Sequence, residues 1–366
     1  MKRMKLPEHR REHCARKPMT KPEFAGVKAG VKVSPRAAAV KGAAVLAVVA
    51  GTLAGCSITP VQPVQPGIGD QSEPPVLQDL PLPAGAVVDP PGQAPDAEVE
   101  AYDWPGSLRP DRESPEERVP DIYKRGRIIV GVDQSQYLLS FRDNATGELK
   151  GFEVDLAREI ARDIFRFPDR VDFRFVDSSK RTEALVSGQV DIVIRTMSIT
   201  KERSEAVDFS APYLDSSVRM LVPTSSHLDG AQDLSDERIC VAAGSNTVNI
   251  ARENFPQHEL LRTRTWTDCL MALQQYQAGL LVGDETILAG FAAQDPLTTV
   301  AGEPFATQHY AVGIPKGYDG LTRQVNYTLN RVRTDGTWDA MFKHWLGPHI
   351  APRTAPQPVY REENND

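Results

Sequence analysis

Scattered cysteines and histidines and the lack of a long apolar run limit what this 366-residue chain can be. No group among its four cysteines and seven histidines has the spacing of a metal site, so the sequence indicates no metal and no other cofactor. The apolar run Gly42–Leu53 is far shorter than the ~20 residues that a membrane-spanning helix needs. We therefore expect a protein without a spanning helix.

Basic residues are scarce beyond residue 55. Residues 1–55 contain 12 of the 42 Lys and Arg residues and three of the 49 Asp and Glu residues, which leaves 30 basic and 46 acidic residues. A net charge near −16 without a basic stripe repels phosphate backbones. We expect no nucleic-acid partner.

The amino-terminal segment has the organisation of an export signal. A basic stretch precedes the apolar run, which ends in Leu53-Ala54-Gly55-Cys56. This ending resembles the bacterial lipobox, in which the cysteine is acylated and becomes the first mature residue; an ordinary cleaved signal is the alternative. We predict a lipoprotein signal peptide over 1–55, with Met19 as an alternative start. Lipid on Cys56 would anchor the protein at the extracytoplasmic face of the cell membrane.

The other cysteines divide by compartment. Cys14 lies in the leader, which leaves Cys240 and Cys269 as an even pair in an exported domain, where a disulfide is the default expectation. Closing a loop of this length stabilises a fold by roughly 3–4 kcal/mol by the chain-entropy argument. Two free buried thiols are the alternative.

Two flanking segments are predicted to be disordered. Residues 56–118 contain repeated prolines and few aromatics, so they indicate an extended tether, and residues 351–366 are expected to form a tail. Between them, short apolar runs alternate with helical patterns, which is typical of α/β sheets with crossover helices. The pattern occurs at Arg127–Ile194 and again at Arg238–Asp284. It indicates two lobes with a ligand crevice at the carboxyl ends of the strands.

Four motifs in this region resemble one known family. They are Gly151-Phe-Glu-Val-Asp-Leu156, Ser198-Ile-Thr-Lys-Glu-Arg203, Val207-Asp-Phe-Ser-Ala-Pro-Tyr213 and Asp335-Gly-Thr-Trp338. In this order they resemble the family-3 periplasmic solute-binding proteins, the polar-amino-acid receptors of ABC importers, over residues 120–347. The likeness is greatest to the glutamate/glutamine-binding lipoproteins of actinobacteria.

The resemblance implies an α/β fold of the two-lobed, type II periplasmic-binding-protein-like kind, a clam-shell with two hinge crossings. Lobe 1 is expected at 119–221 and 310–350, and lobe 2 at 222–309. The hinges are expected near Met220–Pro223 and Tyr310–Ile314. A ligand that contacts both lobes stabilises the closed state.

A free amino acid carries a carboxylate and an ammonium on one carbon, so its receptor needs a cation and an anion close together. A planar Arg fork can hold the carboxylate through two charge-assisted hydrogen bonds. In the family this Arg falls on Arg203, for which a surface ion pair is the alternative role. The family's aspartate for the ammonium falls on Asp284 in lobe 2, where a helix N-cap is the alternative.

Three hydroxyl residues match further ligand positions of the family. Thr196 and Ser198 precede Arg203 and correspond to positions that donate hydrogen bonds to the ligand. The turn Gly244-Ser245-Asn246 matches a Gly-Thr turn whose helix N-terminus faces the ligand carboxylate, with Ser245 in place of the threonine.

Two aromatic positions of the family are polar in this chain. The aromatic that covers the ligand aligns with Gln136, so Tyr137 or Phe141 takes its place, or the cover is polar. The second aromatic position falls on Ser178. These changes indicate a site that is more polar than in most of the family.

Arg195 follows a predicted strand directly before Thr196. It either binds a second carboxylate, which favours glutamate or aspartate over glutamine, or pairs with a structural acid such as Glu153. We therefore expect a small polar amino acid as the ligand: glutamate, aspartate, glutamine or asparagine.

Three functions are compatible with such a clamp. The leading hypothesis is a monomeric receptor that delivers its amino acid to an ABC permease. The second is a sensor that presents ligand status to a membrane signalling protein and a kinase. The third, a lyase, needs an acid in the cleft, for which Glu153 is the candidate. Because Arg203 and Asp284 are both present for zwitterion binding, we do not expect an enzyme.

Overall fold

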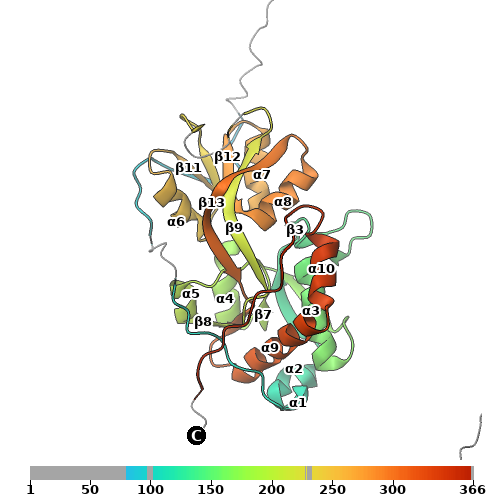
Figure 1. Cartoon of the computed structure of the whole chain (residues 1–366). Helices are drawn as coiled ribbons and strands as arrows, with labels where there is room; N and C mark the ends of the chain where they lie inside the picture. Colours follow the sequence, from blue (N-terminus) through green and yellow to red (C-terminus); the bar gives the residue numbers. More distant parts are fainter. Residues whose placement is uncertain (1–79, 97–101, 227, 229–232, 364–366) are drawn as a thin grey trace, which may run out of the picture. The chain divides into compact units, whose positions relative to one another are not determined.

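The computed structural model describes residues 80–96, 102–226, 228 and 233–363. The predicted signal peptide 1–55, Cys14, the lipidation site Cys56 and residues 56–79 of the predicted tether lie outside these residues. Two mixed sheets with their own helices form the two lobes (Figure 1). No helix in the described ranges is long and apolar enough to cross a membrane.

Lobe 1 is built on a five-stranded sheet with the strand order β6-β2-β7-β14-β8. Its strands are β2 (Ile128–Val132), β6 (Val171–Phe175), β7 (Ile192–Val193), β8 (Val207–Phe209) and β14 (Gly313–Pro315). Strand β2 pairs in parallel with both β6 and β7. The carboxyl ends of these three strands therefore meet at one edge of the sheet, which is where α/β sheets bind ligands.

Eight helices and a small sheet complete the described part of lobe 1. The helices are α1 (Pro115–Arg118), α2 (Pro120–Arg125), α3 (Phe152–Phe165), the 3₁₀ turn η1 (Ser178–Lys180), α4 (Arg181–Val186), α5 (Lys201–Ala206), α9 (Asp319–Thr334) and α10 (Thr337–Trp345). The small sheet has β3 (Ser135–Gln136), β4 (Ser140–Arg142) and β5 (Leu149–Lys150). In α3, Leu156, Ile160 and Ile164 recur every four residues and are buried, so one face of the helix covers the core.

Lobe 2 is built on a six-stranded sheet with the order β1-β11-β10-β12-β9-β13. The strands are β1 (Val87–Asp89), β9 (Leu214–Pro223), β10 (Ile239–Ala242), β11 (Leu260–Thr263), β12 (Leu280–Asp284) and β13 (Thr298–Tyr310). The helices are α6 (Thr247–Asn254), α7 (Trp266–Gln274) and α8 (Glu285–Gln294). The predicted disulfide is confirmed, because Cys240 of β10 is bonded to Cys269 of α7.

The two lobes are joined by two crossings that lie side by side. The chain leaves β8 of lobe 1 through residues 210–213 to begin β9, and it returns from β13 through residues 311–312 to β14. The crossings hydrogen-bond to each other: Ser210 N donates to Val312 O, and Tyr213 N donates to Tyr310 O. The two-lobed α/β fold with two hinge crossings is therefore confirmed.

The first hinge differs in position from the prediction. Residues 220–223 lie inside β9 and pair with β12 and β13, so lobe 2 begins near residue 214 rather than at 222. The sequence of a long strand does not show where a hinge ends and the sheet begins. Only the partner strands show to which sheet a residue belongs.

The structure also differs from the prediction of a disordered tether over 56–118. Strand β1 pairs antiparallel with β11 at the sheet edge, and the buried Asp89 makes ion pairs with Arg252 and Arg262. A capping box of Ser114 and Glu117 starts α1. A segment with few apolar residues cannot form a hydrophobic core of its own. Its backbone can still pair with the edge of an existing sheet.

The predicted tail of residues 351–366 is likewise ordered through residue 363. Arg353 is ion-paired with Glu285 of α8, and Tyr360 forms a parallel bridge with Ser107. Glu363 is ion-paired with Arg323 of α9. Residues 364–366 lie outside the described part of the chain. The tail is held by partners far away in the sequence, which its own composition does not show.

Candidate ligand-binding site

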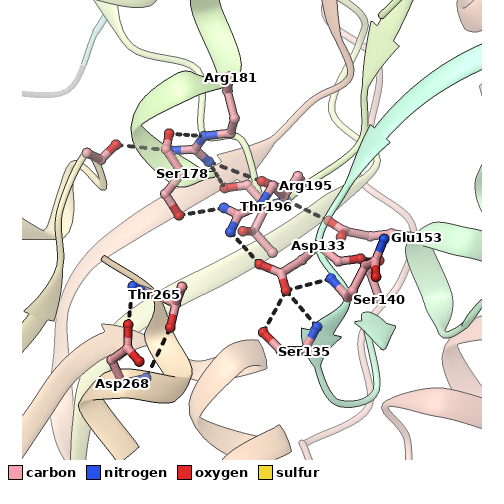
Figure 2. Close-up of polar contacts among 12 residues, drawn as sticks. Asp133, Ser135, Ser140, Glu153, Ser178, Arg181, Arg195, Thr196, Thr265 and Asp268 are labelled. Carbon is pink, nitrogen blue, oxygen red and sulfur yellow. Dashed lines mark hydrogen bonds and ion pairs between the residues drawn. The ribbon is translucent and has the colours of Figure 1, made fainter. Parts of the chain in front are cut away.

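Three strand ends of lobe 1 converge on a buried arginine. Arg195 follows β7 and is fully buried; its Nη2 donates to the Asp133 carboxylate after β2, and its Nη1 donates to Ser178 Oγ after β6 (Figure 2). Asp133 Oδ1 accepts from the backbone N–H groups of Gln134 and Ser135, each at 2.7 Å. Arg195 thus pairs with a structural acid, as one of the two predicted roles required, but the acid is Asp133 instead of Glu153.

Glu153 lies at the start of α3 and is buried. Its Oε1 accepts hydrogen bonds from Thr196 N at 2.7 Å and from the hydroxyl of Tyr213 at 2.5 Å. Burial raises the pKa of Glu153 above its ordinary value, against the lowering effect of these two donors and of Arg195. The carboxyl that was the candidate catalytic acid thus accepts a hydrogen bond from the backbone directly after Arg195.

Arg203 lies in α5 and points across to lobe 2. Its Nη1 donates to Ser198 O at 2.8 Å, and its Nη2 donates to Gly244 O of lobe 2 at 3.1 Å. No ion pair of Arg203 occurs among the described residues, so the alternative of a surface ion pair has no support. The hydroxyl of Ser198 is buried and has no hydrogen-bond partner within the described ranges.

Asp284 ends β12 and occupies the N-cap position of α8. Its side chain makes no capping hydrogen bond within the described structure; Oδ2 accepts instead from the Tyr310 hydroxyl at 2.6 Å. Burial raises the pKa of Asp284 to about 6, although the Tyr310 hydrogen bond and the charges of Arg181 and Arg203 lower it. The other oxygen, Oδ1, is buried without a partner in the described part.

The turn Gly244–Asn246 of lobe 2 contacts lobe 1 through Gly244. Gly244 has a φ of +73°, and a Cβ there would lie 2.5 Å from the Cα of Ser179 in lobe 1. Ser245 directs its hydroxyl to Ala242 O at 2.7 Å, within its own turn. Asn246 Nδ2 donates to Gln308 Oε1 at 2.6 Å. Ser245 lies next to this contact between the lobes, but its hydroxyl is engaged within its own turn, and its role as a ligand-binding residue stays a prediction.

A second contact between the lobes involves the small sheet. A Cβ at Gly290 of α8 would lie 2.5 Å from the Tyr137 carbonyl oxygen. The Tyr137 ring packs edge-to-face on Phe141 at 4.8 Å, and Phe141 packs on Trp345 at 5.9 Å. Gln136 is buried, and neither polar atom of its side chain has a partner in the described residues. The rings of Tyr137 and Phe141 thus form a cluster with Trp345 of α10. The position that aligns with the family's covering aromatic is occupied by the amide of Gln136.

Four residues of this interface were given no role in the site from the sequence. Asp133 and Arg181 contact the strand-end loops of lobe 1. Tyr213 of the first crossing donates to Glu153, and Tyr310 at the end of β13 donates to Asp284. A polar residue directly after the predicted strand Arg127–Val132 is a signal that could have found Asp133. The roles of the others depend on which strands are neighbours, for which the sequence holds no local signal.

The folded part of the chain is similar to known bacterial binding proteins. The profile described as bacterial extracellular solute-binding proteins, family 3, matches residues 128–348. The ABC transporter glutamine-binding protein GlnH of Bacillus subtilis (strain 168) is 29% identical over 236 residues, which is 64% of this chain and 86% of that protein. The glutamate-binding protein GluB of Corynebacterium efficiens is 30% identical over 237 residues, which is 61% of this chain and 80% of the relative.

Solved structures show the same two-lobed fold. The solute receptor for L-cysteine of Neisseria gonorrhoeae has a TM-score of 0.61 at 26% identity and covers 65% of this chain and 98% of its own. An ancestral arginine-binding protein bound to glutamine has a TM-score of 0.57 at 27% identity and covers 61% of this chain and 99% of its own. The family profile begins at residue 128 and ends at residue 348, so it leaves out the described segments 80–96, 102–127 and 349–363.

Proposed function

This chain belongs to the bacterial extracellular solute-binding proteins, family 3, and we propose that it binds a polar amino acid between its lobes and delivers it to an ABC importer. Glutamate, aspartate, glutamine and asparagine are the proposed ligands. The relatives named as glutamine- and glutamate-binding proteins support both the ligand class and the transport role.

One observation carries this proposal: a guanidinium of lobe 1 contacts lobe 2, near enough to a carboxyl of lobe 2 for the charge of one to act on the other. Arg203 of lobe 1 donates to Gly244 of lobe 2, and its charge acts on the carboxyl of Asp284 in lobe 2. The guanidinium suits the α-carboxylate of an amino acid, and the carboxylate suits its ammonium. Because these groups belong to different lobes, a ligand that uses both stabilises the closed state.

Unpaired polar atoms support a ligand with an oxygen acceptor in its side chain. The Nε of Arg195 and the amide of Gln136 are buried without a partner in the described structure. A carboxylate or amide oxygen could accept from these donors. An apolar side chain would leave them unpaired, at a cost of ~1–3 kcal/mol for each buried group. We therefore expect acidic and amide side chains to bind better than aliphatic ones.

We further propose that the protein acts at the outer face of the membrane, held by lipid on Cys56. The sequence Leu53-Ala54-Gly55-Cys56 supports this, and the family is extracellular. Replacing Cys56 by Ser should release the protein from the membrane fraction. Retention of this variant in the membrane would contradict the lipid anchor without touching the ligand proposal.

A thermal-shift screen of the twenty amino acids, followed by calorimetry, tests the binding function. A ligand stabilises by mass action, so the four proposed amino acids should raise the melting temperature and an unrelated sugar should not. Arg203→Ala should abolish binding while leaving the melting temperature of the unliganded protein nearly unchanged. Tight binding by this variant would refute the site.

The transport role is tested in cells that lack the gene. Loss of uptake of the bound amino acid is expected, and the Arg203→Ala gene should not restore it. Normal uptake together with intact binding would replace the transport role by the sensor role.

A further inference from the structure

Arg181 is a buried cation that binds backbone carbonyls. It is the first residue of α4 and only 3% exposed. Its Nε donates to Ser178 O at 2.9 Å, and its Nη1 donates to Arg195 O at 3.1 Å and to Thr196 O at 2.9 Å (Figure 2). No carboxylate of the described chain forms an ion pair with it. A buried guanidinium without a paired acid is costly, so a function that needs its donors is expected.

The backbone that Arg181 holds is strained. Thr196 has a φ of +42°, in the left-handed region that disfavours a β-branched residue. Its N–H is held by Glu153 and its carbonyl by Arg181, one on each side of the residue. Such strain costs roughly 1–3 kcal/mol and persists only where the surroundings determine the conformation. Thr196 follows Arg195 and begins the segment 196–200, which contains Ser198 and leads to Arg203. The conformation of Thr196 therefore sets the direction of this segment, called the ligand loop below.

The remaining donor of Arg181 reaches the other lobe. Its Nη2 donates to Gly244 O at 3.1 Å, and the same oxygen accepts from Arg203 Nη2 at 3.1 Å. Two arginines of lobe 1 thus share one carbonyl of lobe 2. This contact exists only while the turn of Gly244 lies against Ser179.

We propose that Arg181 is a positioning residue that couples the ligand loop of lobe 1 to lobe closure: it holds Thr196 in its left-handed conformation and latches Gly244 of lobe 2. The inference rests on ligand binding between the lobes. Arg181 sets the lifetime of the closed state, whereas Arg203 and Asp284 recognise the ligand itself.

The test is the rate at which bound ligand leaves. Arg181→Met keeps the apolar stem and removes the donors. With radiolabelled glutamate or glutamine, whichever the wild-type protein binds, we expect dissociation about tenfold or more faster, which is the loss of one hydrogen bond to a charged group. The association rate should change little, because closure follows encounter. Arg181→Lys can keep one carbonyl contact, so its dissociation rate should lie between those of the wild type and Arg181→Met.

Arg118→Met is the matched control. Arg118 is also a buried arginine of lobe 1, at 7% exposure, but it binds Asp111 and Gln324. We expect this variant to lower stability without changing the dissociation rate. Gly244→Ala tests the latch from lobe 2, because its Cβ would meet the backbone of Ser179, and dissociation should again be faster.

The dissociation rates separate a failure of the latch from a failure of the proposed function. If the wild-type protein binds none of the amino acids, the proposed function fails. If the wild-type binds and Arg181→Met keeps the wild-type dissociation rate, the latch is refuted and the proposed function stands. If Arg181→Met does not fold, the other two variants decide. The latch is then refuted if both Gly244→Ala and Arg181→Lys keep the wild-type dissociation rate.

Discussion

Replacing Asp284 by Asn should make the unliganded protein more stable while removing ligand binding. The pKa of Asp284 is raised from 3.8 to about 6, chiefly because the carboxyl is buried. The folded state thus resists ionisation of this group. An asparagine side chain keeps an oxygen that can accept from the Tyr310 hydroxyl, which Asp284 binds at 2.6 Å, but it carries no charge. The ligand ammonium loses its partner in this variant.

The size of the gain follows from the pKa shift. A shift of about two pH units at ~1.4 kcal/mol per unit gives about 3 kcal/mol as the upper limit. An acid with a raised folded-state pKa binds more protons in the folded state than in the unfolded state. Its cost is therefore absent below pH ~4, grows between pH ~4 and ~6, and is complete above that range. The Asp284→Asn variant has no ionisable group at this position, so it lacks this destabilisation at every pH.

Urea unfolding of both proteins at several pH values measures this difference. The variant should be more stable at pH 7 by up to about 3 kcal/mol, and the two proteins should become equal near pH 4. Calorimetry should find no amino-acid binding by the variant at either pH. A stability difference that does not depend on pH, or a variant less stable than the wild type at pH 7, would show that burial does not destabilise the ionised form of Asp284.

Two further predictions concern a buried ion pair of lobe 1 and the disulfide of lobe 2. Arg195→Met should destabilise the protein by roughly 3–5 kcal/mol in urea, because it leaves Asp133 buried without its ion-pair partner, and adding Asp133→Asn should recover most of the loss; a cost below ~1 kcal/mol for the single change would contradict the pairing. Replacing Cys240 and Cys269 by Ala should cost roughly 3–4 kcal/mol, and an unchanged urea midpoint would show that the crosslink contributes nothing.

Much of the fold was predictable because its signals are local. The alternating strands and helices, the motif order and the even pair of exported cysteines are all visible in short stretches of sequence. Arg203 could be placed on lobe 1 because it ends one of the four motifs, and Asp284 on lobe 2 because it ends the second strand-and-helix pattern, Arg238–Asp284. The boundary of lobe 2 could not be placed as well, since β9 continues without a break from the hinge into the sheet.

The flanking segments show the limit of composition. Their prolines and polar residues predict a chain that cannot form its own core, and this argument holds only for an isolated segment. In the folded protein, β1 completes the edge of the lobe 2 sheet, and the tail from Arg353 to Glu363 binds residues of both lobes. Partners far away in the sequence decide this order.

The sequence by itself determined the kind of protein: a two-lobed member of a solute-binding family, with a cation in one lobe and an acid in the other. Only the tertiary structure decided what each buried charge does. Arg195 is neutralised by Asp133 rather than by Glu153, and Arg181 binds three carbonyls of its own lobe and one of the other. The physical reason is that an ionisable side chain is defined by the groups that replace its water, and these come from strand ends that are neighbours only in the folded sheet.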